Sequence, residues 1–423
     1  MSPRKGNNFI LPICLSTCLI SGFSLSECSA EVNGYLVGFF KRAEEKNEQL
    51  AQLKIDAEIN EQEKQVATSS FLPTLSIYDV TKVADESSKN KAGTRELDNN
   101  AYVSLEQQIY HGGKEYTLLE LVKIKSRYHI LNQKNARLTL YAALSSVYFN
   151  LWQVREESSI IQTQLAVQEK RIDSIKKRAE IGRSRRSDYL VAIAHKNKLR
   201  SEELRVKGRI SEQLEQMRVL VPDFKLSEIP DGRPVLLGER FGNGGTALAD
   251  KNDLLLARAE IELAENTVAI KQGDYLPTVD FYTNYYVDKS LVGKDDWEIG
   301  VKAGWKLWDF SARSSNLQVA RLEKTQKELK FNEMLKKYTE KEIGLQEREN
   351  LKRQEVAAMQ QYYQEQKRAF KEQQREYENG LISYLDFSRA EEDLINGQRN
   401  ENNVFFEWVL RREERAIFHE HIL

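Results

Sequence analysis

The sequence predicts a mainly α-helical fold with a small antiparallel β part, built from one unit that occurs twice: a strand hairpin followed by a very long helical hairpin. Three observations predict it. Short segments recur along the chain at a nearly constant spacing, the residues around them alternate between apolar and polar, and a long stretch without proline follows each of them. Charged residues make up 30% of the 423 residues, which favours long exposed helices over a loop-rich fold.

The N-terminus has the order of residues found in a secretory signal peptide. Arg4 and Lys5 precede an apolar stretch at residues 9–25, and small residues follow up to Ala30. This order predicts a signal peptide over residues 1–30, with a transmembrane anchor as the alternative.

All three cysteines lie inside this predicted signal peptide, at Cys14, Cys18 and Cys28. The mature chain would therefore have no disulfide and no thiolate chemistry. Lipidation is not expected, because Thr17 and Glu27 are poor residues to precede an acylated cysteine.

The internal repeat is carried by three pairs of matching segments. Residues 71–78 match residues 275–282 at an offset of 276 − 72 = 204, and residues 108–114 match residues 306–312 at 307 − 109 = 198. A third pair, Gly182 with Asp188 and Gly380 with Asp386, again has the offset 198. The constant offset indicates a true duplication, and the change from 204 to 198 places a six-residue difference in the loop of each strand hairpin.

The strand pattern is clearest in the second copy. Between Trp297 and residue 307, apolar residues alternate with charged or small ones, as expected for a strand with one apolar face. Pro73 and Pro277 suit the first position of a strand. We therefore expect strand hairpins over residues 71–113 and 276–310, with a small sandwich around a dry core as the alternative.

Long helices are expected after each hairpin. The stretches that begin at Lys114 and Ser311 contain no proline, and each would span roughly 100 Å as one helix at about 1.5 Å per residue. In the first copy, apolar and small residues recur at alternating steps of four and three, which is typical of a coiled-coil seam. The sequence predicts helical hairpins over residues 114–221 and 311–423.

Three further segments complete the predicted organisation. Residues 31–70 are expected to form an N-terminal helical segment and residues 250–275 a single helix. Residues 222–249 are rich in proline and glycine, which predicts an irregular belt between the two copies.

Two hairpins supply four strands, whereas a closed membrane barrel needs about eight or more. After the N-terminus no segment has the 18 or more apolar residues of a membrane helix, so membrane residence would require strands. Three chains would supply twelve strands. The expected assembly is a homotrimer with a 12-stranded β-barrel continued by an α-helical coiled-coil barrel. Seven apolar residues are expected to face the outer-membrane lipid: Phe281, Tyr285, Trp297, Ile299, Val301, Trp305 and Leu307.

Several segments resemble the TolC family of outer-membrane channel-tunnels. The resemblance lies first in the segments that begin the two strand hairpins, residues 71–75 and 275–279. It lies also in the segments that end the hairpins, residues 109–114 and 307–312, and in the second helical tip at residues 378–387. It covers essentially the whole mature chain. It implies a barrel in the outer membrane, helices that cross the periplasm, and passive export together with a periplasmic adaptor (membrane fusion) protein and an inner-membrane pump or ABC transporter.

The resemblance also implies that adaptor hairpins dock at the two helical tips. The tip glycines alone are explained equally well by helix ends that need a left-handed residue. The arginines of the first tip form either a solvated loop or a surface that selects an acidic adaptor. The expected docking residues are Gly182, Arg183, Arg185, Arg186, Asn379, Gly380, Leu381 and Ile382.

Asp386 occupies the position from which the family builds an acidic constriction. A ring of three carboxylates would repel anions and attract cations, whereas the alternative is an ordinary charge at a helix start. Arg389 stands where the family can show a further acid, which argues against a double acidic ring. Asp188 is interpreted as a helix cap, with a role in holding the gate shut as the alternative.

Other classes of function lack support in the sequence. The formal net charge of −1 argues against a nucleic-acid partner, and no catalytic grouping, metal-ligand cluster or cofactor motif is identified. An enzyme is therefore not expected. The strongest alternative to an outer-membrane duct is a soluble periplasmic coiled-coil scaffold. The exported substrate is not predicted, because in such systems the pump selects it.

Overall fold

A computed structural model describes residues 25–85, 95–182, 184–234, 248–287 and 297–419. Its helices are α1 (Leu25–Lys46), α2 (Glu48–Ser69), α3 (Lys114–Glu180), α4 (Arg186–Leu220), α5 (Asn252–Gly273), α6 (Ala312–Glu378) and α7 (Tyr384–Phe418), with short 3-10 turns η1 (Leu226–Glu228) and η2 (Leu248–Asp250). The strands are β1 (Thr74–Asp85), β2 (Arg95–His111), β3 (Thr278–Tyr286) and β4 (Trp297–Gly304). The expected mainly α-helical fold with two antiparallel strand hairpins is confirmed.

Some predicted segments fall wholly or partly outside this description. Residues 1–24 of the predicted signal peptide lie outside the described residues, while residues 25–30 begin α1. Within the expected belt, residues 235–247 also lie outside them.

The duplication is reproduced in the bounds of the elements. Helix α5 follows α2 at the first offset, both at its start (252 − 48 = 204) and at its end (273 − 69 = 204). Helix α6 follows α3 at the second offset (312 − 114 = 198 and 378 − 180 = 198), and α7 follows α4 in the same way (384 − 186 = 198 and 418 − 220 = 198). The two offsets found in the sequence therefore relate whole elements of structure.

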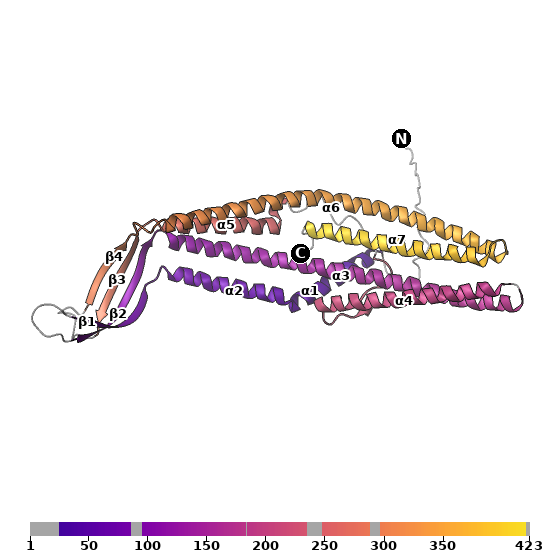
Figure 1. Cartoon of the computed structure of the whole chain (residues 1–423), viewed down its shortest axis with the longest axis horizontal. Helices are drawn as coiled ribbons and strands as arrows, with labels where there is room; N and C mark the ends of the chain where they lie inside the picture. The colour runs from indigo at the N-terminus through magenta and orange to yellow at the C-terminus, as the bar shows by residue number, and fades with distance from the viewer. Residues whose placement is uncertain (1–24, 86–94, 183, 235–247, 288–296, 420–423) are drawn as a thin grey trace, which may run out of the picture. The chain divides into compact units, whose positions relative to one another are not determined.

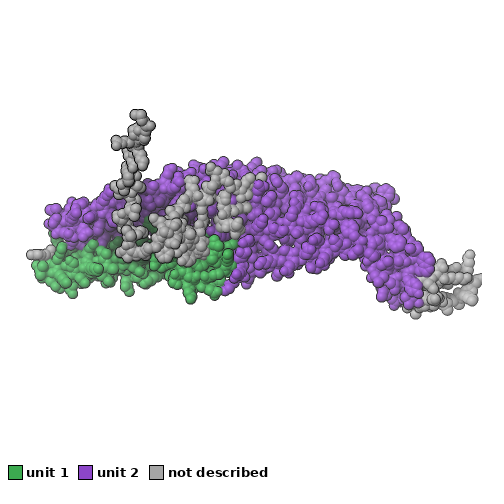
Figure 2. Space-filling view, turned by 180° about the vertical axis from the view of Figure 1, so that it is seen from behind, with its two compact units in different colours: residues 1–43, 150–240 green, residues 44–149, 241–423 purple. Residues whose placement is uncertain are grey.

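The chain divides into two compact units (Figure 2). Unit 1 comprises residues 1–43 and 150–240, and unit 2 comprises residues 44–149 and 241–423. Unit 2 contains the sheet, from which α3, α5 and α6 lead away in Figure 1. None of the described helices is long and apolar enough to cross a lipid bilayer.

In unit 1, the belt segment after α4 contacts both α1 and the second part of α3. Phe39 contacts Phe224 with ring centroids 5.1 Å apart, and Trp152 donates a 2.6 Å hydrogen bond from Nε1 to the carbonyl oxygen of Gly232. Burial of Glu228 opposes its ionisation. A 2.7 Å hydrogen bond from Arg42, a hydrogen bond from the backbone N–H of Lys225 and the positive charges of both residues together outweigh burial, so the pKa of Glu228 lies below its usual value. The belt is therefore irregular but firmly held.

In unit 2, helix α6 packs against both α5 and α7 (Figure 1). The end of α7 is anchored at the start of α5, because Lys251 is buried there and donates to the carbonyl oxygen of Phe418. The Nζ of Lys251 also lies 4.2 Å from the centroid of the Phe418 ring. Nearby, burial raises the pKa of Asp253, which accepts a hydrogen bond from the Tyr338 hydroxyl.

The four strands form one antiparallel sheet in the order β1-β2-β3-β4. The two predicted hairpins are thus joined by pairing of β2 with β3, in which Val103 lies opposite Tyr285 and Leu105 opposite Thr283. A bulge between Gln108 and Tyr110 shifts this register by one residue. Strands β1 and β4 are left as the two edges of the sheet.

The register of the four strands gives the sheet one mainly apolar face and one mainly polar face. Directly opposed residues of neighbouring strands point to the same side, so one face collects the apolar side chains. We call it the apolar face. Its apolar residues are Leu75, Ile77, Val103, Leu105, Val279, Phe281, Tyr285, Trp297, Ile299 and Val301, and the register also places Asp79, Gln107 and Thr283 on this side. The other, the polar face, consists of Ser76, Tyr78, Tyr102, Ser104, Glu106, Tyr282, Asn284, Tyr286, Glu298 and Lys302.

Candidate functional site

The apolar face is exposed to solvent in the single chain. Ile77 has 80% of its surface exposed and Val301 has 63%. Ile299, Tyr285 and Trp297 are likewise exposed, whereas Phe281 is half-buried. An exposed surface rich in apolar side chains marks contact with lipid or with another protein.

Two of the seven residues expected on this face come after the end of β4 in the single chain. Strand β4 ends at Gly304, so Trp305 and Leu307 follow the strand rather than belonging to it. Gly304 lies opposite Thr278, which is the first residue of β3, so the residues after Gly304 have no described strand beside them to accept or donate backbone hydrogen bonds. Both side chains are exposed.

The polar face is organised by hydrogen bonds and tyrosine contacts. The hydroxyls of Tyr282 and Tyr286 donate to the two carboxylate oxygens of Glu298, at 2.8 and 3.0 Å. The rings of Tyr78, Tyr102 and Tyr286 form a row across three strands, with successive centroids 5.1 and 5.4 Å apart. This face can therefore contact water and polar solutes.

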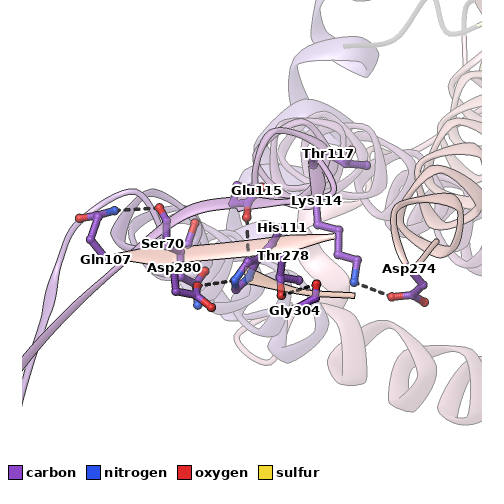
Figure 3. A network of polar contacts seen from close by, with 12 residues as sticks. Ser70, Gln107, His111, Lys114, Glu115, Thr117, Asp274, Thr278, Asp280 and Gly304 are labelled. Atoms are coloured by element: carbon purple, nitrogen blue, oxygen red, sulfur yellow. Dashed lines mark hydrogen bonds and ion pairs between the residues drawn. The ribbon is translucent and has the colours of Figure 1, made fainter. Parts of the chain in front are cut away.

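The junction between sheet and helices is held by an ion pair and by a hydrogen bond between a histidine and a carboxylate (Figure 3). Lys114, the first residue of α3, donates to Asp274 at the end of α5 over 2.5 Å. The Nε2 atom of His111 lies 2.6 Å from Oδ1 of Asp280 on β3. The two contacts tie the first copy to the second at the point where strands become helices. The sequence reasoning missed Asp274 and Asp280, because nothing in the local pattern separates them from other surface acids.

The same junction brings two glycines into backbone contact. Gly112 adopts a left-handed φ of 72°, and a Cβ atom on it would overlap the carbonyl oxygen of Gly273. In the second copy the equivalent residues are Phe310 (112 + 198) and Ser311 (113 + 198), with φ values of 52° and 72°. Non-glycine residues rarely adopt this conformation, so the turn is more strained in the second copy.

The first helical tip is a glycine turn followed by an acidic cap. Gly182 has a φ of 72° and ends α3, while Arg185 and Arg186 are exposed. Asp188 accepts hydrogen bonds from Ser184 Oγ and from the backbone N–H of Arg185, both at 3.1 Å. Asp188 therefore caps the start of α4. Arg183 lies outside the described residues.

The second tip repeats this geometry. Gly380 has a φ of 77°, and Asp386 stands in the first turn of α7, where its backbone N–H donates to Ser383 Oγ over 3.2 Å. The Ser383 hydroxyl in turn donates to Asp386 Oδ2 over 2.6 Å. The Asp386 carboxylate is nonetheless exposed, as are Arg389, Asn379 and Leu381, while Ile382 is half-buried.

An aromatic cluster lies beneath the second tip and was not anticipated from the sequence. The Tyr377 and Phe387 rings stack with centroids 4.8 Å apart, and Phe370 and Tyr384 contact the same Phe387 ring. The spacing of Tyr384 and Phe387, three apart just after the turn, is the signal that could have revealed it. At the first tip the equivalent of Tyr384 is Arg186 (384 − 198), so the two tips differ in charge at this position.

Among the described residues, no group of three or more histidine and acidic residues could hold a metal ion. The candidate surfaces are therefore the two sheet faces, the junction and the tips.

Comparison with known proteins points to one class of protein. Residues 244–409 match the model of a family described as outer membrane efflux protein. A search of curated protein sequences finds no match to the chain.

Solved structures with the same fold cover nearly the whole chain. The outer membrane protein VceC of Vibrio cholerae is 17% identical with a TM-score of 0.78, over 90% of this chain and 96% of its own. The CmeC outer membrane channel of Campylobacter jejuni is 14% identical with a TM-score of 0.81, over 98% and 94%. The MtrE outer membrane channel of Neisseria gonorrhoeae, in its open state, is 16% identical with a TM-score of 0.74, over 92% and 88%.

Proposed function

Because the chain belongs to the outer membrane efflux protein family, we propose that it is the passive exit duct of a tripartite efflux pump or a type I secretion system, gated at its periplasmic helical tips. Members of this family are trimeric, non-enzymatic channels of the outer membrane that work with efflux pumps. Because channels of this family reside in the outer membrane, we no longer favour the alternative of a soluble periplasmic scaffold.

The observation that carries the proposal is a sheet that is incomplete in one chain. Its four strands have one exposed apolar face and one polar face, and four strands are too few to close a wall. Three copies supply twelve strands. Closure then turns the apolar face toward lipid and the polar face toward a water-filled lumen.

The helices support the same assembly. Helix α6 exposes Leu322, Leu329 and Ile343, at spacings of 329 − 322 = 7 and 343 − 329 = 14 along the chain. Apolar residues at multiples of seven form one stripe along a helix, as in coiled coils. This stripe is the surface that another protomer would cover as the helices continue the duct.

In the proposed trimer, the side chains of the polar face line the lumen and contact the exported substrate. Glu298 and Lys302 bring opposite charges, and the tyrosine row brings hydroxyls and ring faces. Such a lining suits a duct that passes solutes without binding one of them tightly. The choice of substrate rests with the pump.

The exposed tip residues are the proposed docking surface for a periplasmic adaptor. The second tip offers Leu381, which is 74% exposed, beside Asn379 and Gly380. The first tip offers the exposed Arg185 and Arg186 instead. Adaptor hairpins that bind around the trimer would therefore meet a tip with an exposed leucine and a tip with exposed arginines in turn.

The proposed gate is tested by the conductance of the purified trimer in planar lipid bilayers. Replacement Asp386→Asn removes the carboxylate charge but retains an oxygen that accepts from Ser383, so the helix cap is kept. If three Asp386 carboxylates form the constriction, we expect Asp386→Asn to raise the leak conductance and to weaken block by polyvalent cations several-fold.

Two controls separate the charge from the fold of the tip. Ser383→Ala removes the cap hydroxyl and keeps the charge, and Asp188→Asn removes the equivalent charge at the first tip. Both are expected to retain cation block. Conductance and block that stay unchanged in Asp386→Asn would take Asp386 out of the gate, whereas a protein that forms no ion-conducting pore under any condition would refute the duct itself.

A further inference from the structure

The polar face of the sheet carries one carboxylate that is held by two tyrosines. Glu298 on β4 accepts hydrogen bonds from the hydroxyls of Tyr282 and Tyr286 on β3, one at each carboxylate oxygen, over 2.8 and 3.0 Å. An ionised carboxylate can accept about four hydrogen bonds, so the two hydroxyls do not exhaust its capacity. Glu298 is exposed, and a ligand in solution can therefore reach it.

Comparison of the two copies of the repeat shows that the sheet does not require this arrangement. The equivalent of Glu298 in the first copy is Asn100 (298 − 198), and the equivalent of Tyr286 is Lys82 (286 − 204). The first copy therefore has neither the acid nor the second hydroxyl. A group that one copy lacks at an equivalent position of the same sheet is not explained by strand pairing alone.

A glycine gives Tyr282 the space to reach the carboxylate. A Cβ atom on Gly300 would lie 2.7 Å from both Cζ and Oη of Tyr282, so the hydroxyl end of that ring lies over the glycine. In the first copy the equivalent of Gly300 is Tyr102 (300 − 198). Its ring stacks on Tyr78, the equivalent of Tyr282 (282 − 204), with centroids 5.1 Å apart. Glycine in place of tyrosine thus replaces a contact between two rings by a contact between a tyrosine and a carboxylate.

The carboxylate also lies next to the tyrosine row. Tyr286 belongs to both, because its hydroxyl donates to Glu298 while its ring lies 5.4 Å from that of Tyr102, with the ring planes tilted by 48°. Tyr78 continues the row and is 39% exposed. The faces of aromatic rings are electron-rich and attract cations. An anionic group and several aromatic rings are therefore adjacent on the polar face.

We propose that Glu298, Tyr282 and Tyr286 form a binding site for organic cations that carry an apolar or aromatic body, such as quaternary ammonium ions. The carboxylate balances the positive charge, and the tyrosine rings contact the alkyl groups around it, which donate no conventional hydrogen bonds. The two hydroxyls hold the carboxylate in place. The site lies within one chain, but its position in a lumen rests on the duct proposed above.

The charges near the site favour a cation over an anion. Glu106 on β2 lies opposite Tyr282 and adds a second exposed acid to the polar face. Lys302, the base on the same side of β4, lies opposite Asp280, so an acid stands beside its charge. An exposed ion pair together with aromatic contacts gives weak binding, with a dissociation constant on the order of 1 mM. Weak binding suits a duct, because the solute must also leave.

Saturation-transfer NMR on the trimer in non-ionic detergent tests the site with benzyltrimethylammonium as the probe. Glu298→Gln removes the charge and keeps an oxygen that accepts from a tyrosine, and it is expected to raise the dissociation constant at least about threefold. Gly300→Ala keeps the charge but displaces the Tyr282 hydroxyl from its place over the glycine. This variant, too, is expected to bind the probe more weakly than the wild type.

Glu106→Gln is the matched control for charge. It also removes one exposed carboxylate per protomer from the polar face, and it leaves both tyrosine hydrogen bonds to Glu298 in place. Its dissociation constant is expected to stay within about twofold of the wild-type value. Benzyl alcohol, a neutral aromatic probe, is expected to bind equally to the wild type and to Glu298→Gln.

The outcomes separate the site from the duct. Unchanged binding of benzyltrimethylammonium in Glu298→Gln, or equal weakening in Glu298→Gln and Glu106→Gln, would overturn the site. Weakening of benzyl alcohol binding to the same extent as that of the cation would overturn it as well. In each of these cases a trimer that conducts ions in planar bilayers leaves the duct standing. Preparations that contain neither trimers nor ion-conducting pores would instead refute the proposed function.

Discussion

Replacing Gly112 by alanine is expected to lower the free energy of unfolding by roughly 2–5 kcal/mol and to reduce the yield of assembled protein. Alanine at a left-handed φ costs about 1–2 kcal/mol, and overpacking in a tight contact adds about 1–3 kcal/mol. The overlap is with the backbone carbonyl of Gly273, which cannot rotate away as a side chain could. Urea unfolding of the detergent-solubilised trimer, followed by tryptophan fluorescence, measures the loss.

The neighbouring glycine provides the control. Gly113 has nearly the same φ, 75°, but nothing lies within 4 Å of a Cβ atom placed on it. Gly113→Ala should therefore lower the free energy of unfolding only by the cost of alanine at a left-handed φ, which is about 1–2 kcal/mol. Equal losses in the two variants would mean that the contact between Gly112 and Gly273 does not hold the junction together.

A charge on the apolar face is expected to prevent stable residence in the outer membrane. Val301→Lys places an ammonium group on the face that we assign to lipid, at a cost of about 2–4 kcal/mol per protomer near the bilayer midplane. The trimer carries three copies of the change. Separation of the membrane fractions should show much less Val301→Lys protein in the outer membrane than wild-type protein.

The adjacent residue tests the assignment of the faces. Lys302 lies one position along β4 and so points to the polar face. Lys302→Gln is expected to reach the outer membrane at the wild-type level. If the Lys302→Gln protein is missing from the outer membrane while the Val301→Lys protein reaches it at the wild-type level, the assignment of the two faces is reversed.

Much of the fold follows from local pattern in the sequence. The absence of proline after Lys114 and Ser311 predicted two long helices, and α3 and α6 each contain 67 residues. The two offsets predicted the duplication because both copies keep the same turn chemistry, with left-handed residues at Gly182 and Gly380. Helix length and turn geometry depend on nearby residues, which is why a single sequence reveals them.

Contacts between distant segments were not predictable in the same way. The pairing of β2 with β3 and the contacts of Asp274 and Asp280 join segments that lie far apart along the chain, in different copies of the repeat. For β4 the sequence pattern predicts a longer strand than the structure contains. The sequence pattern extends through Trp305 and Leu307, whereas β4 ends at Gly304, opposite the first residue of β3.

At the helical tips, too, local geometry was predictable from the sequence and contacts between distant parts were not. Ser383 followed three residues later by Asp386 has the spacing of a helix cap, and the structure contains that cap. A constriction of three carboxylates cannot be seen in one chain, because it exists only where three tips meet.

Extraction of the mature protein from washed membranes tests the central proposal most directly. A trimer whose closed sheet spans the outer membrane should stay in the membrane through washes in plain buffer, and should be released only by detergent, as particles of three chains. Sedimentation of the detergent extract gives the number of chains in each particle. Release into plain buffer as a monomer would contradict the proposal that three copies form an outer-membrane duct.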